Sequence, residues 1–223
     1  MNYIARIYTD FSSKFGIPRQ SRMVKELQGK IVFEPEFRNP EAVRGLEDFS
    51  HIWLIWEFSE AKQTEWSPTV RPPILGGNIR KGVFATRSPF RPNSLGLSAV
   101  KLDKVEIDNE LGSILYVSGA DLMNGTPIFD IKPYIPYADS IPDAKGGFTE
   151  EVEKKVLKVV FPDELLKNIP QEKQNPLVQM LALDPRPAYQ DDDGRIYGLE
   201  FAGFDVRFLV DDDVLTVVDM VDM

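Results

Sequence analysis

Cysteine is absent from the 223 residues of this chain, and histidine occurs only once, at position 51. The lack of cysteine excludes disulfides, thiolate zinc sites, iron–sulfur clusters and cysteine nucleophiles. A single histidine also excludes a histidine-rich metal site, so we expect no metal site. No apolar run approaches the roughly 20 residues that cross a bilayer, and the N-terminal residues lack the basic start and apolar stretch of a signal peptide. We therefore expect a cytoplasmic protein.

Several common catalytic motifs are also missing. No Gly-x-Gly-x-x-Gly sequence leads from a strand into a helix, so the usual fingerprint of dinucleotide enzymes and Rossmann methyltransferases is absent. The chain contains neither the phosphate loop of nucleotide hydrolases nor a Gly-x-Ser-x-Gly elbow. His51 lies in a strongly apolar segment, where a buried structural histidine is a better interpretation than a catalytic base.

Negative charge predominates overall, but it is unevenly distributed. The formal net charge is −9, yet the first 30 residues and residues 71–104 each carry an excess of lysine and arginine. The field close to a surface, rather than the total charge, attracts a polyanion such as RNA. The alternative is that both basic segments are ordinary solvated surface.

The pattern of apolar residues predicts a mainly β protein. Short runs typical of strands occur at 4–8, 30–33, 51–58, 82–86, 97–107 and 113–118, and again at 195–202, 204–210 and 214–220. The segment 51–58 is almost entirely apolar, which suits a strand buried on both faces. Turns are expected at 108–112 and at 211–213. Many short strands separated by glycine and proline favour a barrel or a sandwich.

Three helices are expected among these strands. The first covers 39–49, with Asn39 as N-cap and Pro40 as its first residue. The second begins near Thr149 and continues to about Val159, supported by i,i+4 charge pairs. The third covers 177–183. A proline- and glycine-rich stretch at 142–148 suggests a boundary, with a barrel at 1–145 and a small α+β domain at 146–223.

The loop at 82–98 is the strongest candidate for a binding site. It carries Arg87 and Arg91 among several prolines. Proline stiffens a loop, so the two guanidinium groups would be held ready for a carboxylate or a phosphate. The alternative is a structural loop whose arginines pair with acids elsewhere.

Three further loops combine polar groups with proline. Residues 14–21 contain Pro18, Arg19 and Gln20 in a basic segment, although a plain connection between strands would look similar. Residues 119–134 contain an Asn124-Gly125 turn whose exposed backbone groups could hold an adenine or a ribose, or which could simply close a hairpin. Residues 184–190 place an aspartate, an arginine and a tyrosine where they could stack on and hydrogen-bond a splayed base.

Taken together, these loops resemble the TsaA-like family, whose characterised members are tRNA (adenine-N6)-methyltransferases. The matching pieces are residues 14–20, 43–53, 70–78, 82–98, 125–127 with 130–134, and 184–189. They follow the family's order and span nearly the whole chain. Two residues depart from the family's pattern: Ser94 stands where proline is frequent, and Ile74 stands where a basic residue is common.

The resemblance implies a single-sheeted β-barrel that binds S-adenosylmethionine and a C-terminal α+β domain that contacts tRNA. It also implies a homodimer with the cofactor near the subunit interface. The implied reaction methylates the exocyclic nitrogen of threonylcarbamoyl-adenosine, just 3′ of the anticodon. The implied cofactor contacts are Pro18, Arg19, Gln20, Ser59, Glu60, Arg87, Leu97, Asn124, Gly125, Thr126 and Pro127.

For catalysis we expect Asp184, Arg186 and Tyr189 to orient the base, with Asp184 accepting a proton from the amine. Two alternatives remain open at this point. One is a methyltransferase of the same fold that acts on a small molecule or on another RNA base. The other is a non-catalytic RNA-binding barrel, which S-adenosylmethionine would not stabilise.

Overall fold

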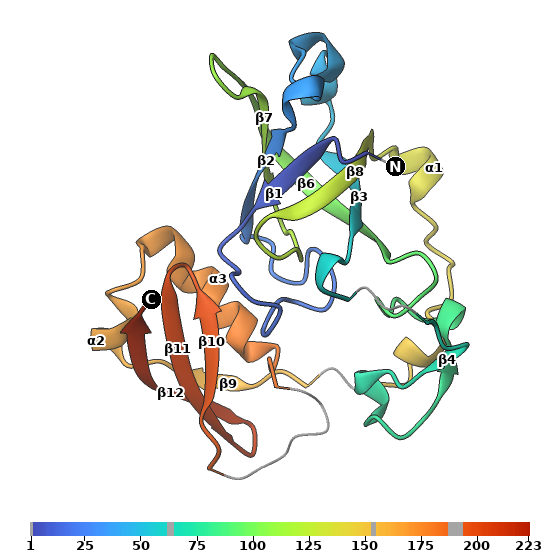
Figure 1. The fold of residues 1–223 in the computed structure, drawn as a ribbon. Helices are drawn as coiled ribbons and strands as arrows, with labels where there is room; N and C mark the ends of the chain where they lie inside the picture. The colour runs from blue at the N-terminus through green and yellow to red at the C-terminus, as the bar shows by residue number, and fades with distance from the viewer. Residues whose placement is uncertain (1, 62–64, 153–154, 187–193) are drawn as a thin grey trace.

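The computed structural model describes residues 2–61, 65–152, 155–186 and 194–223. Six antiparallel strands form a closed barrel in the order β1-β2-β7-β6-β3-β8. They are β1 (Ala5–Tyr8), β2 (Gln28–Phe33), β3 (His51–Glu57), β6 (Leu95–Asp108), β7 (Gly112–Ser118) and β8 (Thr126–Pro133). The predicted barrel is confirmed (Figure 1).

Side chains alternate between the inside and the outside of this barrel, as the two-residue period of a strand requires. In β3 the side chains of Ile52, Leu54 and Trp56 are buried, whereas the residues between them are partly exposed. The expectation that 51–58 is buried on both faces is therefore wrong. The outward Trp53 is half-buried because its indole N–H donates to Asp139 of α1 (Pro136–Asp139) at 3.0 Å.

The predicted helix at 39–49 is replaced by two separate 3-10 turns. The Asn39 cap is confirmed, since its side-chain oxygen accepts from the amide of Glu41 at 3.0 Å. The turn Pro40–Val43 then ends, and a second turn, Leu46–Asp48, follows. Gly45 between them has φ +82, a left-handed conformation that interrupts a right-handed helix.

The predicted strand at 82–86 is also mostly wrong. A short strand, β5 (Lys81–Gly82), pairs with β4 (Thr69–Val70), and the chain then bends into a 3-10 turn, Val83–Ala85. Of that turn only the Val83 side chain is buried, and Phe84 is 71% exposed. A strand with one buried face would bury alternate side chains, whereas this segment buries only Val83.

The C-terminal part contains a second sheet in the order β10-β11-β12-β9. Its strands are β9 (Lys158–Val160), β10 (Tyr197–Phe201), β11 (Phe204–Asp211) and β12 (Val214–Asp222), and its helices are α2 (Asp163–Leu166) and α3 (Gln171–Ala182). The α+β prediction and the turn at 211–213 are confirmed. The predicted helix at 177–183 is present but begins six residues earlier, at Gln171.

The described residues of the segment 149–159, which leave out 153 and 154, do not form the expected helix. A 3-10 turn, Gly147–Thr149, is followed by β9, which runs parallel to β12. Lys155 pairs with Asp213 at 2.8 Å rather than with the glutamate four residues before it, and Lys154 lies outside the described residues. Pairs of the i,i+4 kind contribute only about 0.3–0.5 kcal/mol, whereas the strand arrangement pairs β9 with β12 and buries Leu157 just before it.

The long connection between β1 and β2 belongs to the second core rather than to the barrel. Phe11, Val24 and Leu27 are buried among side chains of α3 and of the C-terminal sheet. Asp10 adds an ion pair to Lys173 at 2.5 Å. Figure 1 shows this connection running between the barrel and the second sheet. Because the start of the chain completes the second core, the division at residue 145 stays a prediction.

Candidate cofactor site at one end of the barrel

One end of the barrel gathers the loops that the sequence marked. Strands β1 and β3 end there, and β6 and β8 begin there, as the register pairs Glu57↔Leu95 and Ile7↔Thr126 show. The connections 9–27, 58–94 and 119–125 all meet at this end. Every residue predicted to contact the cofactor lies on these connections or among the first three residues of β6 or β8. The barrel thus brings five separated stretches of sequence (18–20, 59–60, 87, 97 and 124–127) into one region.

Arg87 and Gln20 are in direct contact there. The guanidinium of Arg87 donates to the side-chain oxygen of Gln20, although the two residues are 67 positions apart. The amide nitrogen of Gln20 in turn donates to the carbonyl of Arg19 at 2.5 Å. Arg87 and Arg19 are exposed, and Pro18 is buried. Two of the predicted loops are therefore joined, with their guanidinium groups facing solvent.

Arg91, the second arginine of the 82–98 loop, has a structural role. Arg91 donates to the carbonyl of Thr86 at 3.1 Å, and the Thr86 hydroxyl bonds back to Val83 at 2.9 Å. These bonds close the segment on itself, so Arg91 holds the loop in shape. The sequence suggested two equivalent binding groups, whereas the structure leaves Arg87 as the outward one.

A buried polar chain lies behind Arg87. The indole N–H of Trp56 donates to the Ser98 hydroxyl at 3.0 Å, and that hydroxyl donates to a carboxylate oxygen of Asp121 at 2.6 Å. Ser98 is 1% exposed. The backbone of Ser21 lies close enough to favour the charged form of Asp121. Because its position is fixed by these groups, the Asp121 carboxylate is preorganised to accept a further hydrogen bond. The sequence analysis did not predict Asp121 as a site residue.

Loss of hydration raises the pKa of the Asp121 carboxyl, while the Ser98 and Ser21 donors and the charge of Arg87 oppose the rise. The folded state therefore holds this proton more tightly than the unfolded chain does. The contribution of the protonated Asp121 carboxyl to the stability of the fold is fully present below its ordinary pKa of 3.8. That contribution is lost as the pH rises through the raised pKa. The charged carboxylate destabilises the fold at neutral pH, which is typical of a group retained for function.

We expect Asp121→Asn to gain stability relative to the unsubstituted protein as the pH rises from about 4 toward neutrality, because an amide does not ionise. Urea denaturation at a series of pH values measures this difference in free energy of unfolding. Asp108→Asn is the matched control, and for it the series is extended below pH 4. Two amide donors, Leu111 and Glu110, lower the pKa of the Asp108 carboxyl, so the sign reverses: this variant should lose stability relative to the unsubstituted protein as the pH rises toward 3.8 and should show little further change above it. A difference for Asp121→Asn that stays constant with pH would contradict the assignment.

The remaining predicted contacts lie around this centre. Leu97, the neighbour of Ser98, is 56% exposed on the outer face of β6. Ser59 and Glu60 form a 3-10 turn after β3, and the amide of Phe58 ties that turn to the carbonyl of Ser94 at 2.9 Å. The departure at Ser94 thus leaves the loop anchored.

The Asn124-Gly125 turn differs from the expectation that its amides are exposed. The amides of Asn124, Gly125 and Thr126 donate to Phe11, Ile7 and Met123 at 2.9, 2.8 and 3.2 Å. The first bond reaches the β1–β2 connection, the second reaches β1, and the third closes the turn itself. The side chains of Thr126 and Pro127 are buried. A Cβ added at Gly125 would meet nothing within 4 Å. What the turn offers is therefore an open backbone surface.

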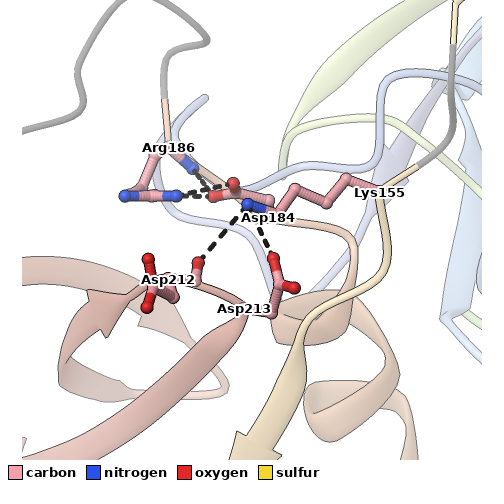
Figure 2. A network of polar contacts seen from close by, with 5 residues as sticks. All are labelled: Lys155, Asp184, Arg186, Asp212 and Asp213. Carbon is pink, nitrogen blue, oxygen red and sulfur yellow. Dashed lines mark hydrogen bonds and ion pairs between the residues drawn. The ribbon is translucent and has the colours of Figure 1, made fainter.

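The predicted catalytic loop at 184–190 follows α3. Both carboxylate oxygens of Asp184 accept from the guanidinium of Arg186 at 2.9 Å, and Arg186 is 8% exposed. Figure 2 shows this pair beside Lys155, which reaches the turn between β11 and β12 at Asp212 and Asp213. Asp184 has φ +53, an unusual value for a residue with a side chain. Tyr189 lies outside the described residues.

Comparison with known proteins decides the family. The family model of the tRNA-methyltransferase O N-terminal domain matches residues 6–140, and that of the TrmO C-terminal domain matches residues 154–223. The chain belongs to the TrmO family. An Escherichia coli member, named tRNA (adenine(37)-N6)-methyltransferase, is 41% identical over 94% of this chain and 92% of its own length.

Other TrmO relatives agree in sequence and in structure. A Pseudomonas aeruginosa protein named a putative S-adenosylmethionine-dependent methyltransferase is 39% identical over 92% of this chain and 90% of its own. A solved structure of P. aeruginosa TrmO superposes with a TM-score of 0.79, at 34% identity, over 99% of this chain and 95% of the other. Among the described residues, no helix is long and apolar enough to cross a membrane.

Proposed function

We propose that this chain methylates the exocyclic nitrogen of the adenosine just 3′ of the anticodon in tRNA, with S-adenosylmethionine as the methyl donor. The observation that carries the proposal is the full-length relationship to the E. coli protein named tRNA (adenine(37)-N6)-methyltransferase. In this proposal the adenosine already bears a threonylcarbamoyl group, and the barrel end is the place where cofactor and base meet.

The groups at the barrel end fit S-adenosylmethionine. The outward guanidinium of Arg87 matches its carboxylate, and the Asp121 carboxylate matches an amino group or ribose hydroxyls. The exposed Leu97 side chain and the open surface at Gly125 suit a flat purine. Pro18, Arg19, Gln20, Ser59 and Glu60 border the same end. Because Pro18, Thr126 and Pro127 are buried, we assign them to shaping the loops that hold the cofactor.

When bound, this cofactor supplies an electrophilic methyl group on a sulfonium. The contribution of the chain is then to position the base, and positioning can supply about 7–11 kcal/mol at the extreme. We assign that task to Asp184, Arg186 and Tyr189. The two-bond pairing with Arg186 fixes the direction of the Asp184 carboxylate, and each oxygen keeps a second lone pair. Asp184 can therefore still accept the proton that the amine releases.

We further propose that the protein acts in the cytoplasm as a homodimer, with the cofactor near the interface. Support comes from large apolar side chains left exposed in the connection that leads to Leu97: Phe84 is 71% exposed and Phe90 is 45% exposed. The Phe84 ring lies 6.0 Å from the ring of Trp66, which is also exposed, and neighbouring exposed apolar groups mark interaction surfaces. A second copy that covers them would also enclose the cofactor end of the first.

Nucleoside mass spectrometry tests the proposed reaction. The protein is incubated with S-adenosylmethionine and tRNA from cells that lack the endogenous activity, prepared with and without the threonylcarbamoyl modification. We expect a methyl group on threonylcarbamoyl-adenosine and none on the unmodified tRNA. The Arg87→Ala protein serves as the matched control and should transfer much less.

Other outcomes would change the proposal in defined ways. Methyl transfer to both tRNAs would keep the reaction and remove the requirement for the threonylcarbamoyl group. No transfer to either tRNA, with cofactor binding still seen by calorimetry, would overturn the substrate and indicate another acceptor. No binding of S-adenosylmethionine would overturn the enzymatic function and favour the non-catalytic RNA-binding barrel.

A further inference from the structure

A hollow of about 470 Å³ lies on the outer wall of the barrel, apart from the candidate cofactor site. Its floor is one rung of the sheet, where the register aligns Ser118 of β7 with Lys101 of β6 and Lys101 with His51 of β3. Its rim is the part of the β1–β2 connection that carries Arg22 and Lys25. Its volume lies within the range of small-ligand sites, about 300–1,000 Å³.

The groups that face this hollow are mostly cationic. Arg22 and Lys25 are exposed, and within the described part of the chain neither takes part in an ion pair. Lys101 pairs with Asp103 at 2.6 Å, and Asp103 also accepts the Ser118 hydroxyl. His51 lies between these groups. With one carboxylate against two lysines and an arginine, the hollow is positive in a chain whose net charge is −9.

The rim is held in place by the backbone. The amide of Arg22 donates to the carbonyl of Gly119 at 2.8 Å, and the amide of Gly119 donates to Leu27 at 2.8 Å. Arg22 has φ +64, and a Cβ at Gly119 would lie 3.3 Å from the Arg22 Cα. A non-glycine residue kept in this left-handed conformation is characteristic of functional loops. The backbone of Arg22 is thus held at the rim of the hollow by a loop with a fixed conformation.

The hollow adjoins the cofactor end of the barrel. Leu97 and Lys101 both point outward from β6 and are four residues apart, which is about 13 Å along a strand. Ser21, next to Gln20, also lines the hollow, and its backbone lowers the pKa of the Asp121 carboxyl. A strand of RNA whose base enters the cofactor end would therefore cross this basic hollow with its backbone.

We propose that the hollow binds backbone phosphates of the RNA substrate beside the nucleotide that is methylated, with Arg22 and Lys25 as the phosphate ligands. This inference rests on the proposed function, because it assumes that RNA is the substrate. The backbone is the part recognised, since guanidinium and ammonium groups match phosphate oxygens.

The Arg22→Gln/Lys25→Gln double variant tests the assignment. Binding of tRNA and KM for tRNA are measured across a range of salt concentrations. We expect KM to rise by about tenfold for each phosphate ligand removed near 0.1 M salt, and the slope of log K against log salt to become shallower by about one for each of them. The value of kcat at saturating tRNA and the affinity for S-adenosylmethionine should not change. Arg44→Gln/Lys145→Gln, which removes one exposed arginine and one exposed lysine elsewhere, is the charge-matched control.

His51 provides a second readout that does not depend on turnover, because it is the only histidine in the chain. Its imidazole gives a single set of NMR signals. Loss of hydration and the charges of Arg22 and Lys101 lower its pKa below 6.5, against the opposing charge of Asp103. A phosphate bound among these groups should raise that pKa. The probe is an anticodon stem-loop RNA, with inorganic phosphate at equal phosphate concentration as the comparison.

The inference is supported if the RNA raises the His51 pKa in the unsubstituted protein but not in the double variant. An equal rise with inorganic phosphate would overturn it in favour of a small-anion site. An unchanged His51 titration together with an unchanged salt slope, in a protein that still methylates tRNA, would overturn the hollow's role and leave the proposed function intact. Failure to methylate any tRNA would contradict the proposed function instead, and the titration would still report on RNA binding.

Discussion

Replacing Arg87 with alanine is expected to weaken the binding of S-adenosylmethionine by roughly 10- to 100-fold and to leave the fold unchanged. Hydrogen bonds to charged groups contribute about 1.5–3 kcal/mol, and each 1.4 kcal/mol is about a factor of ten in affinity. The side chain is exposed and its hydrogen bond is to Gln20, so its loss leaves no buried group unpaired. Isothermal titration calorimetry measures the affinity, and thermal denaturation checks the fold.

Two further variants make the result specific. Arg87→Lys keeps the positive charge but loses the planar fork, so it should recover only part of the affinity. Arg44→Ala removes an exposed arginine from the opposite end of the barrel, in the connection between β2 and β3, and should bind the cofactor normally. If Arg87→Ala bound S-adenosylmethionine as tightly as the unsubstituted protein, the carboxylate of the cofactor would have to lie elsewhere.

Gly96→Ala is expected to have the largest effect on stability, about 3 kcal/mol or more, because overpacking a filled core costs about 1–3 kcal/mol and occasionally exceeds that range. An added Cβ would lie 2.2 Å from the Trp56 ring. That ring is 6% exposed and its N–H is bonded to Ser98, so it has little freedom to move. Urea denaturation gives the free energy of unfolding. Cofactor affinity should fall as well, because Ser98 orients Asp121.

Gly82→Ala is the matched control, since Gly82 has φ −57 and a Cβ there would meet nothing within 4 Å. Its effect should be small. Trp56→Phe in the Gly96→Ala background should recover part of the stability by making room for the methyl group, and a double-mutant cycle measures that coupling. An unchanged unfolding free energy for Gly96→Ala would show that the tryptophan can be displaced at little cost.

Local patterns in the sequence predicted several features of the fold correctly. Apolar runs located five of the six barrel strands, but β8 was not predicted. The turn at 108–112 forms because Asp108 accepts from two amides at 2.8 Å. The Asn39 cap forms as expected, although the helix after it does not. These features depend on residues within a few positions of one another, and for that reason they can be inferred from neighbours in the chain.

Local sequence patterns predicted only part of the candidate site. The sequence drew attention to Arg87 and Gln20 through the composition of their loops, but it could not show that they touch. Asp121 lies in the loop that leads to the Asn124-Gly125 turn, yet its sequence neighbours do not distinguish it, because its role depends on burial against Ser98 and on the nearness of Arg87. A carboxylate in a loop has no local signature of being desolvated.

By itself, the sequence determined the fold class, the family resemblance and the loops that carry polar groups, since each depends on residue type and short spacing. Only the tertiary structure decided which loops meet. Barrel closure brought the five cofactor stretches to one end, and it aligned His51 and Lys101 beneath Arg22. It was also packing between distant segments that placed Phe11 in the C-terminal core and made a strand of 158–160. Such outcomes depend on which partner a segment finds, and that information is spread over the whole chain.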